Sequence, residues 1–117
     1  MTGYSRGDVV LVSFGFSDET GEKRRPAIIV SSDAYHQGRQ EAIFAAITST
    51  TDRILAGDHL ISDWQDAGLL SPSVATGIIR TIKQSMIAKK IGTMPRPDMQ
   101  AIEGNLRDAL GLKQRKE

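Results

Sequence analysis

Short apolar runs, interrupted at close intervals by glycine, proline and polar turns, dominate the pattern of this 117-residue chain. The first run, Asp8–Phe14, is rich in valine and lies between Gly7 and Gly15, which predicts a β-strand. Further strands are predicted at residues 27–31, 41–49, 58–61, 74–82 and 86–93. Several short strands separated by closely spaced turns favour a small barrel or sandwich over alternating βαβ units.

The pattern also indicates where these strands lie and what connects them. Residues Glu41–Ser49 read EAIFAAITS, apolar on both faces, so this strand should lie inside the barrel. Pro26 is expected to open the strand before it, since proline is tolerated at a strand's first position. The stretch Ser17–Arg24 contains no apolar residue and is predicted to be an exposed, mobile loop. Short helical segments are predicted at residues 32–38 and 63–68.

The C-terminal part has the clearest helical pattern. Apolar residues recur every three or four positions from Met99 to Leu110, and Pro97 suits the first turn of a helix. Asp98 is expected to interact favourably with the positive N-terminal end of the helix dipole. Gly111 is expected to cap the helix, and residues 113–117 to form a frayed tail. We therefore predict one domain over residues 1–112.

Composition narrows the possible chemistry. The absence of cysteine excludes a thiolate nucleophile and sulfur-based zinc sites. His36 and His59 are too far apart in sequence to form a helical ligand pair, so no metal and no other cofactor is expected. His36 is better explained as a structural or exposed histidine than as a general base. No stretch approaches the roughly 20 apolar residues of a membrane span, which predicts a cytoplasmic protein without membrane contact.

An arginine precedes the proline in the segment Lys23-Arg24-Arg25-Pro26. Because Pro26 biases the residue before it away from the helical region, Arg25 should be held extended at the boundary between the polar loop and a buried strand. Its planar guanidinium, with five N–H donors, suits bidentate contact with a phosphate. Taken alone, an arginine in this position is most often an ordinary surface residue.

Four pieces of the sequence together resemble one family. They are the opening RGDVVLVSF, Arg25-Pro26 followed by AIIVSS, the strand AAITS, and GLLSPSV followed by RTIKQSMIAKKIG. In this order and spacing they are similar to the MazF/PemK/Kid toxins, over nearly the whole chain. The resemblance implies a mainly β fold, a small SH3-like β-barrel of the CcdB/MazF type with a C-terminal helix and short helical insertions. It also implies a homodimer that cleaves single-stranded RNA, including mRNA, at short sequences and is neutralised by a cognate antitoxin protein.

The resemblance assigns roles to two positions. The family's arginine before the proline falls on Arg25 and its strand threonine on Thr48, which makes these two the predicted catalytic residues. The predicted RNA-binding residues are Lys23, Arg24, Ser49, Thr50 and Arg80. Without a metal or a cysteine, the simplest reaction uses the RNA's own 2′-hydroxyl as nucleophile. Arg25 would stabilise charge on the phosphoryl oxygens and Thr48 would position the phosphate or the nucleophile.

One segment departs from the family pattern. Where many relatives carry a charged residue after the Pro-Ser-Val segment, residues 75–78 of this chain read ATGI. Arg80 could compensate, because with a period of two it shares one strand face with Thr76 and Ile78. Two alternatives stay open: a catalytically degenerate relative that binds only antitoxin or RNA, and a gyrase poison of the CcdB type, which would depend on its C-terminal helix.

Overall fold

The computed structural model describes residues 3–14 and 23–112, and these contain six strands and three short or medium helices. The strands are β1 (Asp8–Phe14), β2 (Lys23–Ile29), β3 (Glu41–Thr48), β4 (His59–Leu60), β5 (Val74–Lys83) and β6 (Ile87–Thr93). The helices are α1 (Asp33–His36), the 3-10 helix η1 (Gln84–Met86) and α2 (Arg96–Ala109). The mainly β fold with a C-terminal helix is confirmed. Most of the predicted loop 17–24 and the tail 113–117 lie outside the described residues.

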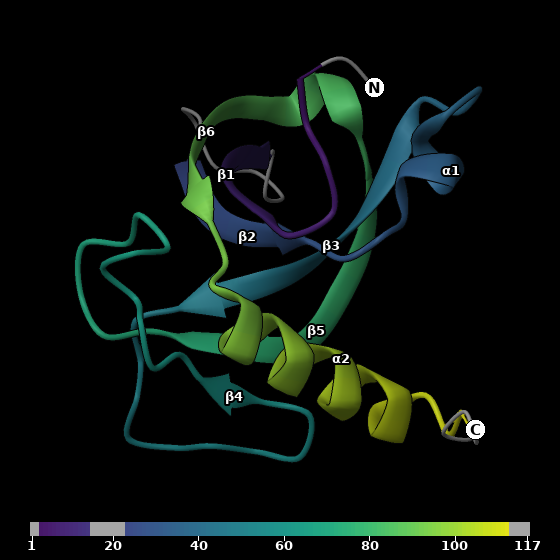
Figure 1. The fold of residues 1–117 in the computed structure, drawn as a ribbon. Coiled ribbons are helices and arrows are strands. Elements are labelled where there is room, and N and C mark those ends of the chain that lie inside the picture. Colours follow the sequence, from purple (N-terminus) through teal and green to yellow (C-terminus); the bar gives the residue numbers. More distant parts are fainter. Residues whose placement is uncertain (1–2, 15–22, 113–117) are drawn as a thin grey trace.

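All six strands belong to one antiparallel sheet in the order β4-β5-β3-β2-β1-β6. β5 and β6 are consecutive in the chain and joined only by η1, yet three strands separate them in the sheet. The sheet must therefore curl, and Figure 1 shows β5, η1 and β6 arching over β1 and β2. The curled sheet has a concave inner face and a convex outer face.

Both faces of the sheet are buried, because neighbouring residues on each strand face different clusters. Val10 of β1 and Phe44 of β3 belong to a cluster of buried apolar residues on the inner face, the inner cluster. Val9 and Ala45 belong to a second such cluster on the outer face, the outer cluster. This two-sided burial explains why the strands read as nearly continuous apolar runs. β3, flanked by β2 and β5, is a central strand as predicted.

Helix α2 and the loop between β4 and β5 cover the outer face. Met99, Ile102 and Leu106 of α2 pack against the outer cluster, as their spacing predicted. The buried apolar face of the helix ends sooner than predicted, because Leu110 is 56% exposed. Gly111 caps the helix with φ +70°, and the N–H groups of Gly111 and Leu112 donate to the carbonyls of Asp108 and Arg107. Among the described residues, no helix is long and apolar enough to cross a membrane.

β2 begins earlier than the sequence predicts. Lys23, Arg24 and Arg25 belong to the strand, where they pair with β1 up to Phe14. The prediction failed because this extension depends on a partner strand rather than on local propensity. Pro26 is tolerated inside the strand because pairing with β3 begins only at Ala27, so at Pro26 only β1 is paired.

Asp98 does more than complement the helix dipole, and here the prediction was incomplete. Its carboxylate is 1% exposed and accepts hydrogen bonds from His59 Nε2 (2.7 Å) and from the backbone N–H groups of Ser62 (2.9 Å) and Asp63 (3.1 Å). Burial alone would raise the pKa of Asp98, but these hydrogen bonds outweigh burial and lower it. Asp98 therefore fastens α2 to β4 and to the loop that follows it.

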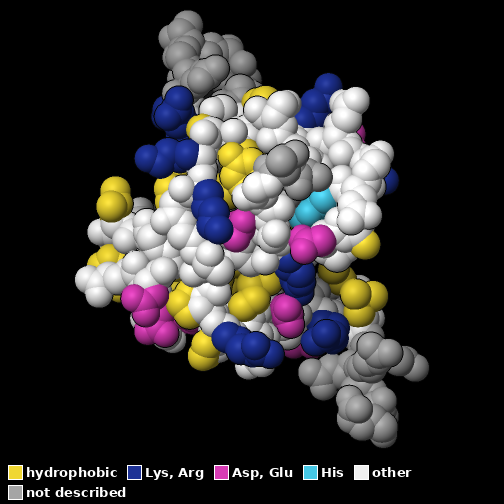
Figure 2. All heavy atoms as spheres, turned by 45° about the horizontal axis from the view of Figure 1, so that its top comes forward, with side chains coloured by type: hydrophobic (Ala, Val, Ile, Leu, Met, Phe, Trp, Pro, Cys, Tyr) yellow, Lys and Arg dark blue, Asp and Glu magenta, His cyan; other side chains and the backbone are white. Residues whose placement is uncertain are grey.

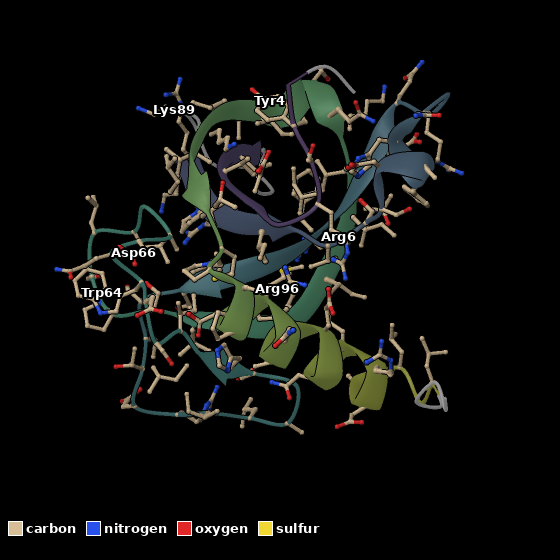
Figure 3. All side chains as sticks on the ribbon, viewed as in Figure 1. Tyr4, Arg6, Trp64, Asp66, Lys89 and Arg96 are labelled. Atoms are coloured by element: carbon tan, nitrogen blue, oxygen red, sulfur yellow. The ribbon has the colours of Figure 1, made fainter. Side chains whose placement is uncertain are left out.

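That loop lies directly against β6. Residues 63–68 form a turn rather than a full helix, closed by Ala67 N–H to the Asp63 carbonyl and ending at Gly68 with φ +87°. A Cβ on Gly68 would lie 1.9 Å from the carbonyl oxygen of Ile91, so only glycine allows this approach. Trp64, at the edge of the molecule in Figure 3, is half-buried and packs against the outer cluster.

Candidate functional site

The inner face of the sheet continues beyond the buried core into a groove lined by Arg25 and Thr48. The last pair between β2 and β3 joins Ala27 to Ala46. Continuing that register by two residues places Arg25 opposite Thr48, on the face that Ala27 and Phe44 share. Both residues line one hollow of about 610 Å³. The structure thus brings the two predicted catalytic residues together.

The hydroxyl of Thr48 accepts a local hydrogen bond and can still donate one. Its Oγ1 accepts the backbone N–H of Thr50 at 3.1 Å, which orients the hydroxyl at the end of β3. A hydroxyl that accepts one hydrogen bond still has its own hydrogen to donate, so Thr48 can donate to a phosphate oxygen in the groove. Ser49 and Thr50 line the same hollow and are exposed, as the prediction of RNA contacts requires.

Arg80 lies in the part of the groove next to the hollow that contains Thr48. It lines a second, more apolar hollow of about 190 Å³ together with Arg25, Phe44 and Ile78. Arg25 and Ile78 border both hollows, so Arg80 lies on the continuation of the same groove. The predicted shared face of residues 76, 78 and 80 is confirmed in part: Ile78 borders both hollows, but Thr76 lines only the first and Arg80 only the second.

Lys23 and Arg24 are the predicted site residues that the described structure does not place in the groove. Both are exposed on β2, but neither is among the described residues that line the two hollows. Arg24 alternates with Arg25 along the strand and therefore points to the opposite face. Their part in RNA binding stays a prediction.

Sequence reasoning missed four residues that the loop between β3 and β4 contributes to the groove: Arg53, Leu55, Ala56 and Asp58. All four line the hollow that contains Arg25. Arg53 follows Thr48 by only five residues in a polar stretch, which was an available signal. The stretch has no periodicity, however, so nothing local indicated that it folds back over the concave face.

Neither histidine lies among the described residues that line the groove. His36 is 2% exposed and shares a 2.6 Å hydrogen bond between its Nε2 and Ser31 Oγ. Burial lowers the pKa of His36, opposed by the nearby Asp33 carboxylate. The expectation of a structural histidine is therefore confirmed. His59 is held by Asp98 beneath α2.

Charge of both signs is spread over the surface that Figure 2 draws, where Lys and Arg side chains are interspersed with Asp and Glu. The formal net charge of the chain is only +1. Three arginines and a row of hydroxyls along the groove can hold a phosphodiester and stabilise charge on its oxygens, which matches phosphate-directed chemistry.

Comparisons with known proteins address the family and the fold of this chain. A search of curated protein sequences gave no match. Among solved structures, an endoribonuclease in complex with its cognate antitoxin from a mycobacterial species is 22% identical, with a TM-score of 0.77 over 97% of this chain and 100% of that one. The Mycobacterium tuberculosis toxin MazF-mt6 is 23% identical, with a TM-score of 0.73 over 92% and 99% of the two chains.

A MazE–MazF structure from Deinococcus radiodurans is 18% identical, with a TM-score of 0.76 over 94% of this chain and 97% of that one. At such identities these likenesses show the fold alone. The profile of one family, described as PemK-like, MazF-like toxin of type II toxin-antitoxin system, matches residues 5–110. The chain belongs to this family of PemK-like and MazF-like toxins.

Proposed function

We propose that the chain is a metal-independent endoribonuclease that cleaves single-stranded RNA. The observation that carries the proposal is that Arg25 and Thr48 line the same hollow. Membership in a family of type II toxins supports it, as do the similar structures that are named endoribonucleases. The proposed catalytic residues are Arg25 and Thr48, and Ser49, Thr50 and Arg80 are proposed to contact the RNA on either side.

In the proposed reaction, the 2′-hydroxyl of the RNA attacks the adjacent phosphorus. The new bond joins O2′ to phosphorus, and the bond from phosphorus to O5′ breaks. The 2′-hydroxyl loses its proton and the leaving O5′ gains one, so the products are a 2′,3′-cyclic phosphate and a 5′-hydroxyl. Arg25 stabilises the negative charge that grows on the phosphoryl oxygens, while Thr48 donates to one of them and fixes the phosphate for attack.

Single substitutions test this assignment. Arg25→Ala and Thr48→Ala should each reduce the cleavage rate about 10²–10³-fold, the usual effect of removing one preorganised donor. Matched controls are Arg39→Ala, beyond the opposite end of β3, and Thr81→Ala, an exposed strand threonine. Their rates should stay near that of the wild type. Binding of RNA without any cleavage by the wild type would instead assign the chain as a catalytically degenerate relative.

We also propose that a cognate antitoxin covers this groove. Similar toxins have been crystallised with their antitoxins. An acidic, disordered segment would suit the arginines in the groove and would become ordered on binding. Hydrogen exchange should then show protection of residues 23–25 and 48–50 when the antitoxin is bound. Protection confined to other surfaces would contradict the proposal.

A further inference from the structure

The loop between β3 and β4 forms the wall of the groove that faces Arg25. Its residues Arg53, Leu55 and Ala56 are among those that line the same hollow as Arg25 and Thr48. Arg53 therefore adds a second guanidinium to this hollow, whereas Arg80 lines the neighbouring hollow that Arg25 also borders.

Asp58 anchors this loop to the rest of the fold. Its Oδ2 accepts the N–H of Leu55 at 2.9 Å, and its Oδ1 accepts the N–H of Gly77 in β5, also at 2.9 Å. The side chain of Asn105 in α2 donates to the Asp58 carbonyl at 3.0 Å. The end of the loop is thus fixed to the sheet and to the helix, and the segment that carries Arg53 has a defined position over the groove.

The anchoring point lies in residues 75–78, the segment that is expected from the sequence to depart from the family pattern. β5 bulges there, because Ala45 pairs with Ile79 whereas Ile47 pairs with Ala75. A Cβ on Gly77 would lie 3.3 Å from the Cα of Gly57, so the backbone of the loop already fills the space beside this part of β5. The close approach of the loop to β5 therefore depends on glycine at position 77.

From this geometry we infer that Arg53 is a phosphate-positioning residue of the RNA groove and supplies the cation that residues 75–78 lack. This inference rests on the proposed function and deepens it. RNA lying along the concave face meets Arg80, Arg25 and Arg53 in turn. Arg25 contacts the reacting phosphate, and Arg53 holds a neighbouring phosphate on the Thr48 side.

Binding measurements with Arg53→Gln test the inference. The probe is a short random-sequence oligoribonucleotide made uncleavable by 2′-O-methyl groups, titrated over a range of salt concentrations. Arg53→Gln should weaken binding about tenfold and reduce the slope of log K against log salt by about 0.7, the value for one phosphate contact on a single strand. Arg53→Lys should retain the slope because it retains the charge.

The matched control is Arg39→Gln, which removes the same charge from an exposed site beyond the far end of β3. It should leave affinity and salt slope unchanged. In cleavage assays, Arg53→Gln should raise KM and leave kcat within about twofold, whereas Arg25→Ala lowers kcat. An Arg53→Gln protein with wild-type affinity and salt slope would overturn the inference while leaving cleavage by the wild type intact. A wild type that binds RNA without cleaving it would overturn the proposed function and leave the Arg53 inference standing on the binding data.

Discussion

Replacing Asp98 with asparagine tests whether one buried carboxylate holds the outer layer of the fold together. In the native structure Asp98 accepts hydrogen bonds from His59 and from the backbone N–H groups of Ser62 and Asp63. Asparagine keeps one acceptor oxygen and puts an NH₂ group in place of the other. At least one donor would then face another donor at a site that is 1% exposed.

The expected loss of stability follows from these contacts. A hydrogen bond to a charged acceptor contributes about 1.5–3 kcal/mol net. The three contributions will not add in full, because Ser62 and Asp63 are exposed and their N–H groups can return to water. We therefore expect Asp98→Asn to lower the free energy of unfolding by about 3 kcal/mol at neutral pH. With a urea slope of about 2 kcal/mol/M, the midpoint should fall by roughly 1.5 M.

The carboxylate of Asp98 should also affect how the free energy of unfolding depends on pH in acid. The pKa of Asp98 is lowered in the folded state, so as pH falls the unfolded chain takes up the proton first. The stabilisation from Asp98 is complete above the unfolded pKa of about 3.9 and is lost as pH falls from there through the lower folded pKa. Asp98→Asn should consequently lose less stability in acid than the wild type does.

Urea unfolding followed by circular dichroism, at neutral pH and at several acidic pH values, measures both effects. Asp66→Asn is the control, since Asp66 is exposed at the edge of the same loop (Figure 3). Its free energy of unfolding should equal that of the wild type to within about 0.5 kcal/mol. Equal stability of Asp98→Asn and wild type at neutral pH, together with identical acid dependence, would refute this account of Asp98.

Further results are expected for two glycines, for His36 and for the oligomeric state. Gly68→Ala should lower the free energy of unfolding, measured in urea, by about 3 kcal/mol or more, because the new Cβ would collide with the Ile91 carbonyl at a residue with positive φ. Gly104→Ala has open space around it and should stabilise α2 by about 0.5–1 kcal/mol. The pKa of His36 is lowered in the folded state, so the unfolding free energy should decrease as pH falls below about 6.5, and His36→Gln should remove that dependence. Sedimentation equilibrium at micromolar concentration should give a dimer mass, since a domain this small gains from covering apolar surface; a monomer mass alone would contradict the proposed homodimer.

The sequence predicts best the elements whose pattern is local. The bounds of β1 match the prediction because its valine run ends at a glycine, and the cap at Gly111 follows from the position of glycine after the last helical turn. The resemblance to a known family supplied Arg25 and Thr48 as candidates. The register of β2 and β3 supplies the physical reason why they meet.

Other features depend on contacts between distant parts of the chain, which no local pattern encodes. The partners of Asp98 lie 35 to 39 residues away, so the sequence indicated only its place at a helix N-terminus. Lys23 and Arg24 looked like loop residues because their strand is formed by pairing with β1. Arg53 lines the groove from a loop that Asp58 joins to Gly77, again through a contact across 19 residues.

The central claim, cleavage through the RNA's own 2′-hydroxyl, is tested most directly by one modified substrate. An RNA that the wild-type protein cleaves is synthesised with a single 2′-deoxy nucleotide immediately 5′ of the cleaved bond and incubated in EDTA beside the unmodified strand. The unmodified strand should yield a 2′,3′-cyclic phosphate and a 5′-hydroxyl, while the deoxy strand stays intact and binds with similar affinity, since phosphates and bases elsewhere provide most of the affinity. Cleavage of the deoxy strand, or cleavage that stops with EDTA and returns with magnesium, would contradict the account and assign the attack to an activated water.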